Sequence, residues 1–220
     1  MRRRFEEQLN DLNQELMHMA NQVQGSIQKA IGALLKQDIE LAQKVINNDK
    51  EIDRQKKNIE SKCFTLLMQQ QPVASDLRMI SAALRMVTDM ERIGDHAADI
   101  SELTIMLANE PYIKNLEHIS KMASETMYML ITGMESFMDK DMEKAKKVIS
   151  HDDIIDELFT ETKRELIDLI HQDKNNGEQA TDLLMVAKYF ERIGDHATNI
   201  AEWVIYSITG EHEYANEKEM

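Results

Sequence analysis

The chain has 220 residues, of which 42% are hydrophobic and 30% are charged, as in a globular protein rather than a disordered one. The formal net charge of −14 argues against a nucleic-acid partner, because phosphate binding needs a basic surface. One cysteine excludes an intramolecular disulfide, and the sequence lacks a run of 18 apolar residues that could span a membrane. Seven glycines and two prolines are too few for an all-β protein, so the composition predicts an all-α fold.

Three helices are predicted in the first half of the chain, over about residues 5–36, 38–70 and 75–108. The first carries apolar residues three or four positions apart, which is the pattern of a helix with one buried face: Leu9, Leu12, Leu16, Met19, Val23, Ile27, Ile31 and Leu34. Pro72 precedes the third helix, where Ser75 or Asp76 is a candidate N-terminal cap. The lone Cys63 is predicted to be a small buried residue of the second helix.

Three further helices are predicted in the second half, over about residues 112–138, 141–172 and 178–208. Asn175-Asn176-Gly177 predicts a helix stop and a turn between the last two. The connections at Gln37-Asp38 and Lys140-Asp141 are very short, so the helices that they join should pack antiparallel.

The two halves are copies of one unit of about 100 residues. Residues 91–102 (ERIGDHAADISE) match residues 191–202 (ERIGDHATNIAE) at nine of twelve positions, and residues 38–53 match residues 141–156 at nine of sixteen. The join lies near Pro111, so we expect one three-helix domain over residues 1–110 and a second over 111–220. The predicted fold is two tandem three-helix bundles, with a continuous six-helix bundle as the alternative.

Both copies carry pairs of acidic residues four positions apart, which lie on one face of a helix. The pairs and the residues that follow them are Asp49/Asp53 and Glu91/Asp95 with Asp99, then Asp152/Asp156 and Glu191/Asp195 with Asn199. Like charges at this spacing destabilise a helix by roughly 0.2–0.5 kcal/mol, and two adjacent pairs would direct four or five carboxylates to one point. Hard cations such as magnesium accept such oxygen ligands, as do iron and manganese. The alternative is a solvated acidic surface neutralised by Arg92 and Arg192.

Residues around the acidic pairs suggest packing rather than catalysis. His96 and His196 lie about 140° around the helix from the glutamates, so we interpret them as packing or partner-contact residues. Gly94 and Gly194 each cost about 1 kcal/mol in a helix relative to alanine, which predicts close approach of a neighbouring backbone. A methionine-rich stripe is predicted to be core. Phosphate-binding glycine loops, nucleophile elbows and zinc-protease motifs are absent from the sequence.

The sequence resembles the PhoU family of phosphate-uptake regulators, most specifically at residues 71–78 (QPVASDLR) and in both ERIGDHA segments. The resemblance implies two three-helix bundles, a cytoplasmic location and a homodimer. It also implies that the acidic pairs hold iron, zinc or other divalent ions, with Asp49, Asp53, Glu91, Asp95 and Asp99 in the first copy. The second set is Asp152, Asp156, Glu191, Asp195 and Asn199. Asn199 departs from the acid at Asp99, which should weaken or change the second site.

The resemblance further implies a non-enzymatic adaptor between the ATPase subunit of a phosphate ABC transporter and a sensor histidine kinase. Such a protein represses phosphate-starvation genes and touches membranes at most peripherally, through its partners. Two alternatives remain open: a ferritin-like di-metal redox enzyme and a metal-free helical scaffold. The ferritin-like class uses Glu-x-x-His motifs inside the bundle, and the comparable Glu15-x-x-His18 has no equivalent in the other copy.

Overall fold

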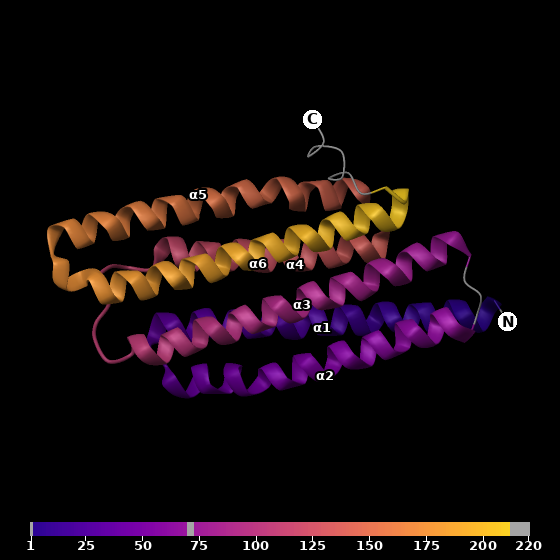
Figure 1. Ribbon diagram of the computed structural model, residues 1–220, viewed down its shortest axis with the longest axis horizontal. Helices are drawn as coiled ribbons and strands as arrows, with labels where there is room; N and C mark the ends of the chain where they lie inside the picture. The colour runs from indigo at the N-terminus through magenta and orange to yellow at the C-terminus, as the bar shows by residue number, and fades with distance from the viewer. Residues whose placement is uncertain (1, 70–72, 212–220) are drawn as a thin grey trace.

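The structure, a computed structural model, describes residues 2–69 and 73–211 and is all-α, as predicted (Figure 1). Its helices are α1 (Arg2–Lys36), α2 (Ile39–Gln69), α3 (Ala74–Leu107), α4 (Glu117–Asp139), α5 (Met142–Gln172) and α6 (Gly177–Thr209), with a 3-10 turn at Lys174–Asn176. Within these described ranges, no helix contains an apolar stretch long enough to cross a bilayer. We call α1–α3 the first repeat and α4–α6 the second.

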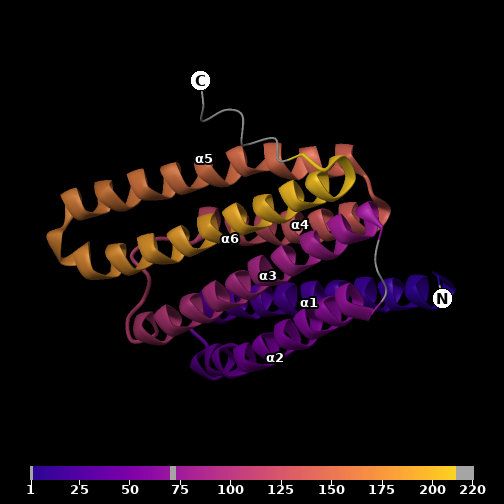
Figure 2. The same cartoon turned by 45° about the vertical axis from the view of Figure 1, so that its right-hand side comes forward.

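Each repeat is an antiparallel three-helix bundle, and the two bundles lie side by side along their long axes (Figures 1 and 2). α3 and α6 run next to each other through the middle of the molecule, and α1 also packs against α4. The buried apolar side chains of both repeats form one continuous cluster. The fold is therefore two tandem three-helix bundles that share a core, which combines features of both arrangements expected from the sequence.

The predicted apolar stripe of the first helix is buried along its whole length, from Leu9 to Leu34. Cys63 is also buried, and burial raises the pKa of its thiol to about 12, so it is an inert core residue. The predicted methionine core is confirmed, because five of the stripe's side chains are fully inaccessible to solvent: Met86, Met90, Met122, Met129 and Met134.

The turns that join the first two helices of each repeat are built alike. Gln37 and Lys140 occupy equivalent positions and have left-handed backbones, with φ of 53° and 54°. The carboxylates of Asp38 and Asp141 then accept the backbone N–H groups of Leu41 and Lys144 at 2.9 and 3.0 Å, which caps α2 and α5. The very short connections therefore reverse the chain as predicted.

One helix boundary differs from the sequence expectation. α4 begins at Glu117, five residues later than expected, because Gln179 holds the preceding segment by accepting from the N–H of Ile113 and donating to the carbonyl of Pro111. The predicted stop and turn between the last two helices is present: Asp173 terminates α5, a 3-10 turn follows at Lys174–Asn176, and Gly177 opens α6 with a right-handed helical backbone. Gln71 and Pro72, the start of the family-like QPVASDLR segment, lie outside the described residues.

Candidate metal centres

Three aspartates of the first repeat converge where α2 packs on α3. Asp49, Asp53 and Asp95 each place one carboxylate oxygen within 4.8 Å of the other two, and all three side chains are half-buried. Helical spacing stacks Asp49 on Asp53, while the antiparallel packing of α2 and α3 brings Asp95 to them. We call these residues together with Glu91 the first centre.

The electrostatics of the first centre favour a cation. Burial, followed by the charges of Asp95 and Asp53, raises the pKa of Asp49 from 3.8 to about 6. Its buried Oδ1 has no hydrogen-bond partner among the described residues. A buried oxygen without a donor is costly, so a bound cation would satisfy an acceptor that the described residues leave unpaired.

Gly94 keeps the first centre compact. A Cβ atom at this position would lie 2.9 Å from Cδ1 of Ile52 and 3.5 Å from Oδ1 of Asp49. The sequence predicted close approach of a neighbouring backbone, but in both repeats the neighbours are side chains, since Gly194 faces Asp152 and Ile155. The absence of a side chain at position 94 therefore lets α3 approach the ligand-bearing face of α2.

The other two predicted ligands of the first repeat have protein partners, as does Asp95, whose Oδ2 accepts from Arg92 at 2.9 Å. Glu91 lies beside the three aspartates and pairs with Lys56 on α2, with Oε1 3.1 Å from Nζ. Asp99 lies one turn beyond Asp95, and its Oδ2 is 3.2 Å from Nδ1 of His96. Of the five predicted residues, the structure thus brings three together, keeps Glu91 at their edge and places Asp99 farther along α3.

The second repeat contains an equivalent acidic set, Asp152, Asp156, Glu191 and Asp195, which we call the second centre. Burial, followed by the charges of Asp195 and Asp156, raises the pKa of Asp152 to about 6. Burial and Glu191 likewise raise the pKa values of Asp156 and Asp195. Over residues 2–69 and 73–211, however, three ligand atoms within 4.8 Å of one another occur only in the first centre, so the second is looser.

Asn199 faces the junction of the repeats. Its side-chain amide donates to Oδ1 of Asp89 at 3.3 Å, and Nδ1 of His196 lies 2.9 Å from the same oxygen. His96 stacks on Tyr189, with ring centroids 5.4 Å apart, and its ring centroid lies 5.8 Å from that of His196. Both histidines therefore pack between α3 and α6, as predicted.

The donor set of the first centre fits a divalent or trivalent cation. Carboxylate oxygens from two helices, one of them unpaired and buried, suit magnesium, manganese or iron, and zinc also accepts carboxylate ligands. Asp49, Asp53 and Asp95 would hold the ion, with Glu91 as a further ligand. Such an ion would supply charge neutralisation and a cross-link between α2 and α3.

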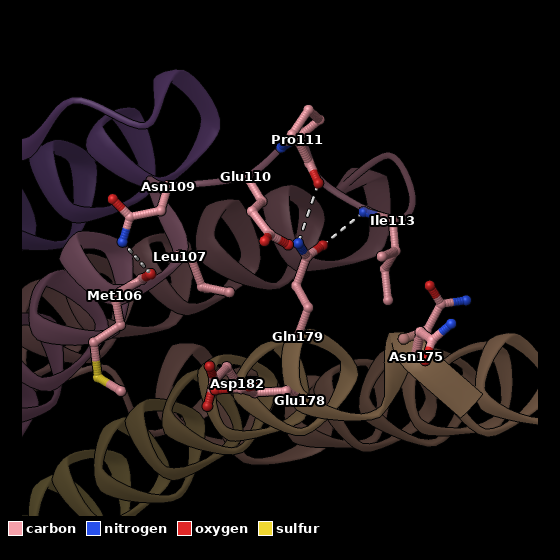
Figure 3. Close-up of a pocket in the computed structure, with 11 residues that line it drawn as sticks. Met106, Leu107, Asn109, Glu110, Pro111, Ile113, Asn175, Glu178, Gln179 and Asp182 are labelled. Atoms are coloured by element: carbon pink, nitrogen blue, oxygen red, sulfur yellow. Dashed lines mark hydrogen bonds between the residues drawn. The ribbon is translucent and has the colours of Figure 1, made fainter. Parts of the chain in front are cut away.

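One cavity lies away from both centres, at the junction of the repeats (Figure 3). Its volume is about 620 Å³, and its walls come from the end of α3, the linker that follows and the start of α6. Glu110, Glu178 and Asp182 line it, and burial together with Glu178 raises the pKa of Asp182. The cavity is therefore acidic and open to solvent.

Sequence reasoning missed the residues that surround the centres. Lys188 pairs with Glu191 at 2.5 Å, much as Lys56 pairs with Glu91, and Asp89 joins the two repeats. The repeat alignment pairs Asp89 with Tyr189 and Lys188 with Thr88, so it offers no signal for them. The candidate redox residues Glu15 and His18 line a surface groove, where Glu15 pairs with Lys62.

Comparison with known proteins finds relatives that match both repeats. A family model described as the PhoU domain matches residues 16–104 and 119–204, once in each repeat. Two relatives named phosphate-specific transport system accessory protein PhoU homolog are similar over nearly their full length. The Clostridium acetobutylicum protein is 38% identical over 95% of this chain and 96% of its own. The Aquifex aeolicus protein is 40% identical over 96% of this chain and 97% of its own.

Solved structures show the same fold. The crystal structure of PhoU from Pseudomonas aeruginosa superposes with a TM-score of 0.89 at 32% identity, covering 94% of this chain and 100% of that one. The phosphate transport system regulatory protein PhoU from Streptococcus pneumoniae gives 0.87 at 29% identity, covering 94% and 98%. The chain therefore belongs to the PhoU family, a family of regulatory accessory proteins that are not enzymes.

Proposed function

We propose that this chain is a cytoplasmic regulator of phosphate uptake that couples the ATPase subunit of a phosphate ABC transporter to a sensor histidine kinase. When phosphate is plentiful, it would hold the kinase in the state that represses phosphate-starvation genes. One observation carries this proposal: relatives named as phosphate-specific transport accessory proteins match both repeats over nearly the whole of each chain.

The surface of the molecule supports a role in binding other proteins. Two long bundles present extended helical faces, and the net charge of −14 favours partners with basic surfaces. Negative charge at the centres would repel free phosphate, so the phosphate signal should reach this chain through the transporter. We also propose that the chain acts as a homodimer, which places four acidic centres in one assembly.

We further propose that the centres bind iron, zinc, manganese or magnesium as structural supports. The unpaired Oδ1 of Asp49 and the convergence of Asp53 and Asp95 support this role for the first centre. An ion there would tie α2 to α3 without taking part in catalysis. Glu91 and Asp99 in the first repeat, and Asp152, Asp156, Glu191, Asp195 and Asn199 in the second, stay predicted ligands.

Direct binding and gene repression test the adaptor role together. The purified chain should bind the purified ATPase subunit and the cytoplasmic region of the kinase from the same organism. Deletion of the gene should switch on phosphate-starvation genes in phosphate-rich medium, and the wild-type gene should restore repression. If neither partner binds and the deletion strain still represses these genes, the adaptor role is wrong.

A further inference from the structure

Each acidic centre holds one lysine ammonium against its glutamate. In the first centre, Nζ of Lys56 lies 3.1 Å from Oε1 of Glu91, and the two side chains are only 21% and 13% exposed. In the second, Lys188 donates to Oε1 of Glu191 at 2.5 Å, with exposures of 37% and 15%. These pairs are more buried than a typical surface salt bridge, so solvent screens them less.

The two lysines come from positions that are not equivalent in the repeats. Lys56 lies on α2, and the matching residue of α5 is Phe159, whose ring centre is 5.4 Å from Nζ of Lys188. Lys188 lies on α6, and the matching residue of α3 is Thr88, whose hydroxyl bonds to the carbonyl of Leu84. The equivalent glutamates therefore receive their ammonium groups from different helices. In the first repeat the lysine lies on the neighbouring helix, and in the second it lies on the glutamate's own helix.

The different positions of the two lysines show that the centres share a charge pairing rather than a residue at one position. The residue identities at positions 56 and 88 differ from those at 159 and 188, yet each centre has one lysine on one glutamate. Without this lysine, the negative charge of the half-buried glutamate beside the aspartates would be less well neutralised, since Arg92 pairs mainly with Asp95 and is 56% exposed. A lysine nitrogen is also a point charge that can leave its partner by rotation of its flexible stem.

We propose that Lys56 and Lys188 are built-in counter-cations that set the metal affinity of the centres. In the metal-free protein each ammonium neutralises the glutamate, and it must move away before that glutamate can become a ligand. Metal and lysine therefore compete for one carboxylate, and the affinity of the aspartates for metal is weaker than their geometry alone would give. This inference rests on the proposed metal centres.

Removal of the competing ammonium should strengthen metal binding by about tenfold, or about 1.4 kcal/mol, because the ammonium repels the incoming cation and occupies a carboxylate that would otherwise be a ligand. The test uses the full chain with Asp152→Asn and Asp156→Asn, so that Mn²⁺ titration reports on the first centre. In this background, Lys56→Met is compared with Lys57→Met. Lys57 is the adjacent, exposed lysine, so both variants lose the same net charge.

A second variant transplants the arrangement of the other repeat. Lys56→Phe combined with Thr88→Lys moves the ammonium from α2 to α3, and it should return Mn²⁺ affinity to the level of the parent protein. This variant also controls for packing, because the ammonium is restored while the original lysine stem is not. Circular dichroism checks that every variant keeps its helical content.

The outcomes separate the inference from the metal centre itself. Tighter Mn²⁺ binding by Lys56→Met, with Lys57→Met unchanged and the transplanted lysine weakening affinity again, supports the counter-cation role. If the parent protein binds Mn²⁺ but Lys56→Met binds it equally or less tightly, the inference is wrong and the metal centre stands. If the parent protein binds no Mn²⁺, iron, zinc or magnesium, the metal centre and the inference fall together.

Discussion

In the first repeat, oxygens of Asp49, Asp53 and Asp95 lie within 4.8 Å of one another, and the described part of the second repeat has no such group. The second repeat nevertheless keeps the same acids, a glycine at the same place and one lysine on its glutamate. What differs is the surroundings, since a Cβ at Gly194 would lie 3.1 Å from Oδ1 of Asp152, against 3.5 Å for Gly94 and Asp49. Duplication thus preserved the ligand types while the packing around them diverged.

A second difference lies at the outer pairs of helices. Lys62 on α2 pairs with Glu15 on α1, whereas at the equivalent positions Glu165 on α5 lies 3.3 Å from His118 on α4. The polarity of the contact is reversed, but an ion pair is possible in both repeats. Compensating changes of this kind keep the bundle geometry while they alter the charge that each helix presents to a partner.

The largest expected effect concerns metal content. Asp49→Ala with Asp53→Ala should weaken binding of the tightest ion by at least about 100-fold, because two of three converging ligands are removed. Asp152→Ala with Asp156→Ala should cost less, since that centre is looser. Elemental analysis after purification without chelators, with circular dichroism to confirm intact helices, checks both. Equal losses would remove the distinction between the repeats, and unchanged metal content would contradict the ligand assignment.

The packing of Gly94 on Ile52 predicts that the effect of Gly94→Ala on stability changes sign when Ile52 is shortened. Ile52→Ala alone should destabilise the chain by about 2–5 kcal/mol, since the side chain is buried. Gly94→Ala should cost about 1–2 kcal/mol in the native background, where the new methyl group meets Ile52, but should stabilise by about 1 kcal/mol in the Ile52→Ala background. Urea unfolding of the four proteins measures the coupling. Additive effects would mean that Ile52 does not limit the approach of α3.

The second repeat gives a contrasting version of this test. There a methyl group at position 194 would meet Asp152 before Ile155, at 3.1 and 3.4 Å. Gly194→Ala should therefore act mainly on metal binding in the second centre rather than on the free energy of unfolding. Adding Ile155→Ala should not reverse its effect on stability. A reversal as strong as that in the first repeat would show that the two glycines have the same role.

Asp49 and Asp152 should behave alike toward protons. Because the pKa values of Asp49 and Asp152 are both raised to about 6, each carboxyl binds its proton more tightly in the folded than in the unfolded chain. The resulting stabilisation is present below about pH 4 and is lost as the pH rises through about 6, by about 1 kcal/mol for each group after allowance for solvent screening. Unfolding of the metal-free protein from pH 4 to 7 should show this decline.

Substitution of each aspartate tests whether its carboxyl causes the decline of stability with pH. Asp49→Asn and Asp152→Asn should each flatten about the same part of the decline, since neither amide titrates. Saturating Mn²⁺ should reverse the trend, because metal binding requires ionised ligands and is favoured at higher pH. A metal-free protein whose stability rises steadily from pH 4 to 7 would contradict the raised pKa values.

The smallest effect is expected at the junction of the repeats. Asn199→Asp would place a carboxylate against Asp89 and should destabilise the chain by about 1 kcal/mol, and Asp89→Asn should relieve most of that loss. If Asn199→Asp instead raises Mn²⁺ affinity in the second centre without loss of stability, Asn199 faces that centre rather than Asp89.

Much of the fold follows from the sequence, because its determinants are local or repeated. The apolar spacing of α1 defines a buried face, and the matching segments at 38–53 and 141–156 define the duplication. The late start of α4 could not be predicted, since it depends on Gln179, which is 66 residues from Ile113. The acidic pairs were visible as i, i+4 spacings, but which carboxylates converge depends on the register of α2 against α3.

The residues that compensate the charge of the centres are hidden for a similar reason. Lys56 and Lys188 occupy positions that do not correspond in the two repeats, so sequence comparison treats them as unrelated. Asn199 reads as a substituted ligand until the contact with Asp89 across the repeats is known. Pairings between helices are set by packing, and helical periodicity within one segment does not determine them.

Anomalous scattering from crystals grown with Mn²⁺ tests most directly whether α2 and α3 hold an ion together. The strongest peak should lie among Asp49, Asp53 and Asp95, with a carboxylate oxygen from each helix at bonding distance and a weaker peak in the second centre. A protein that binds Mn²⁺ in solution but shows its strongest peak away from these three aspartates would contradict the assignment.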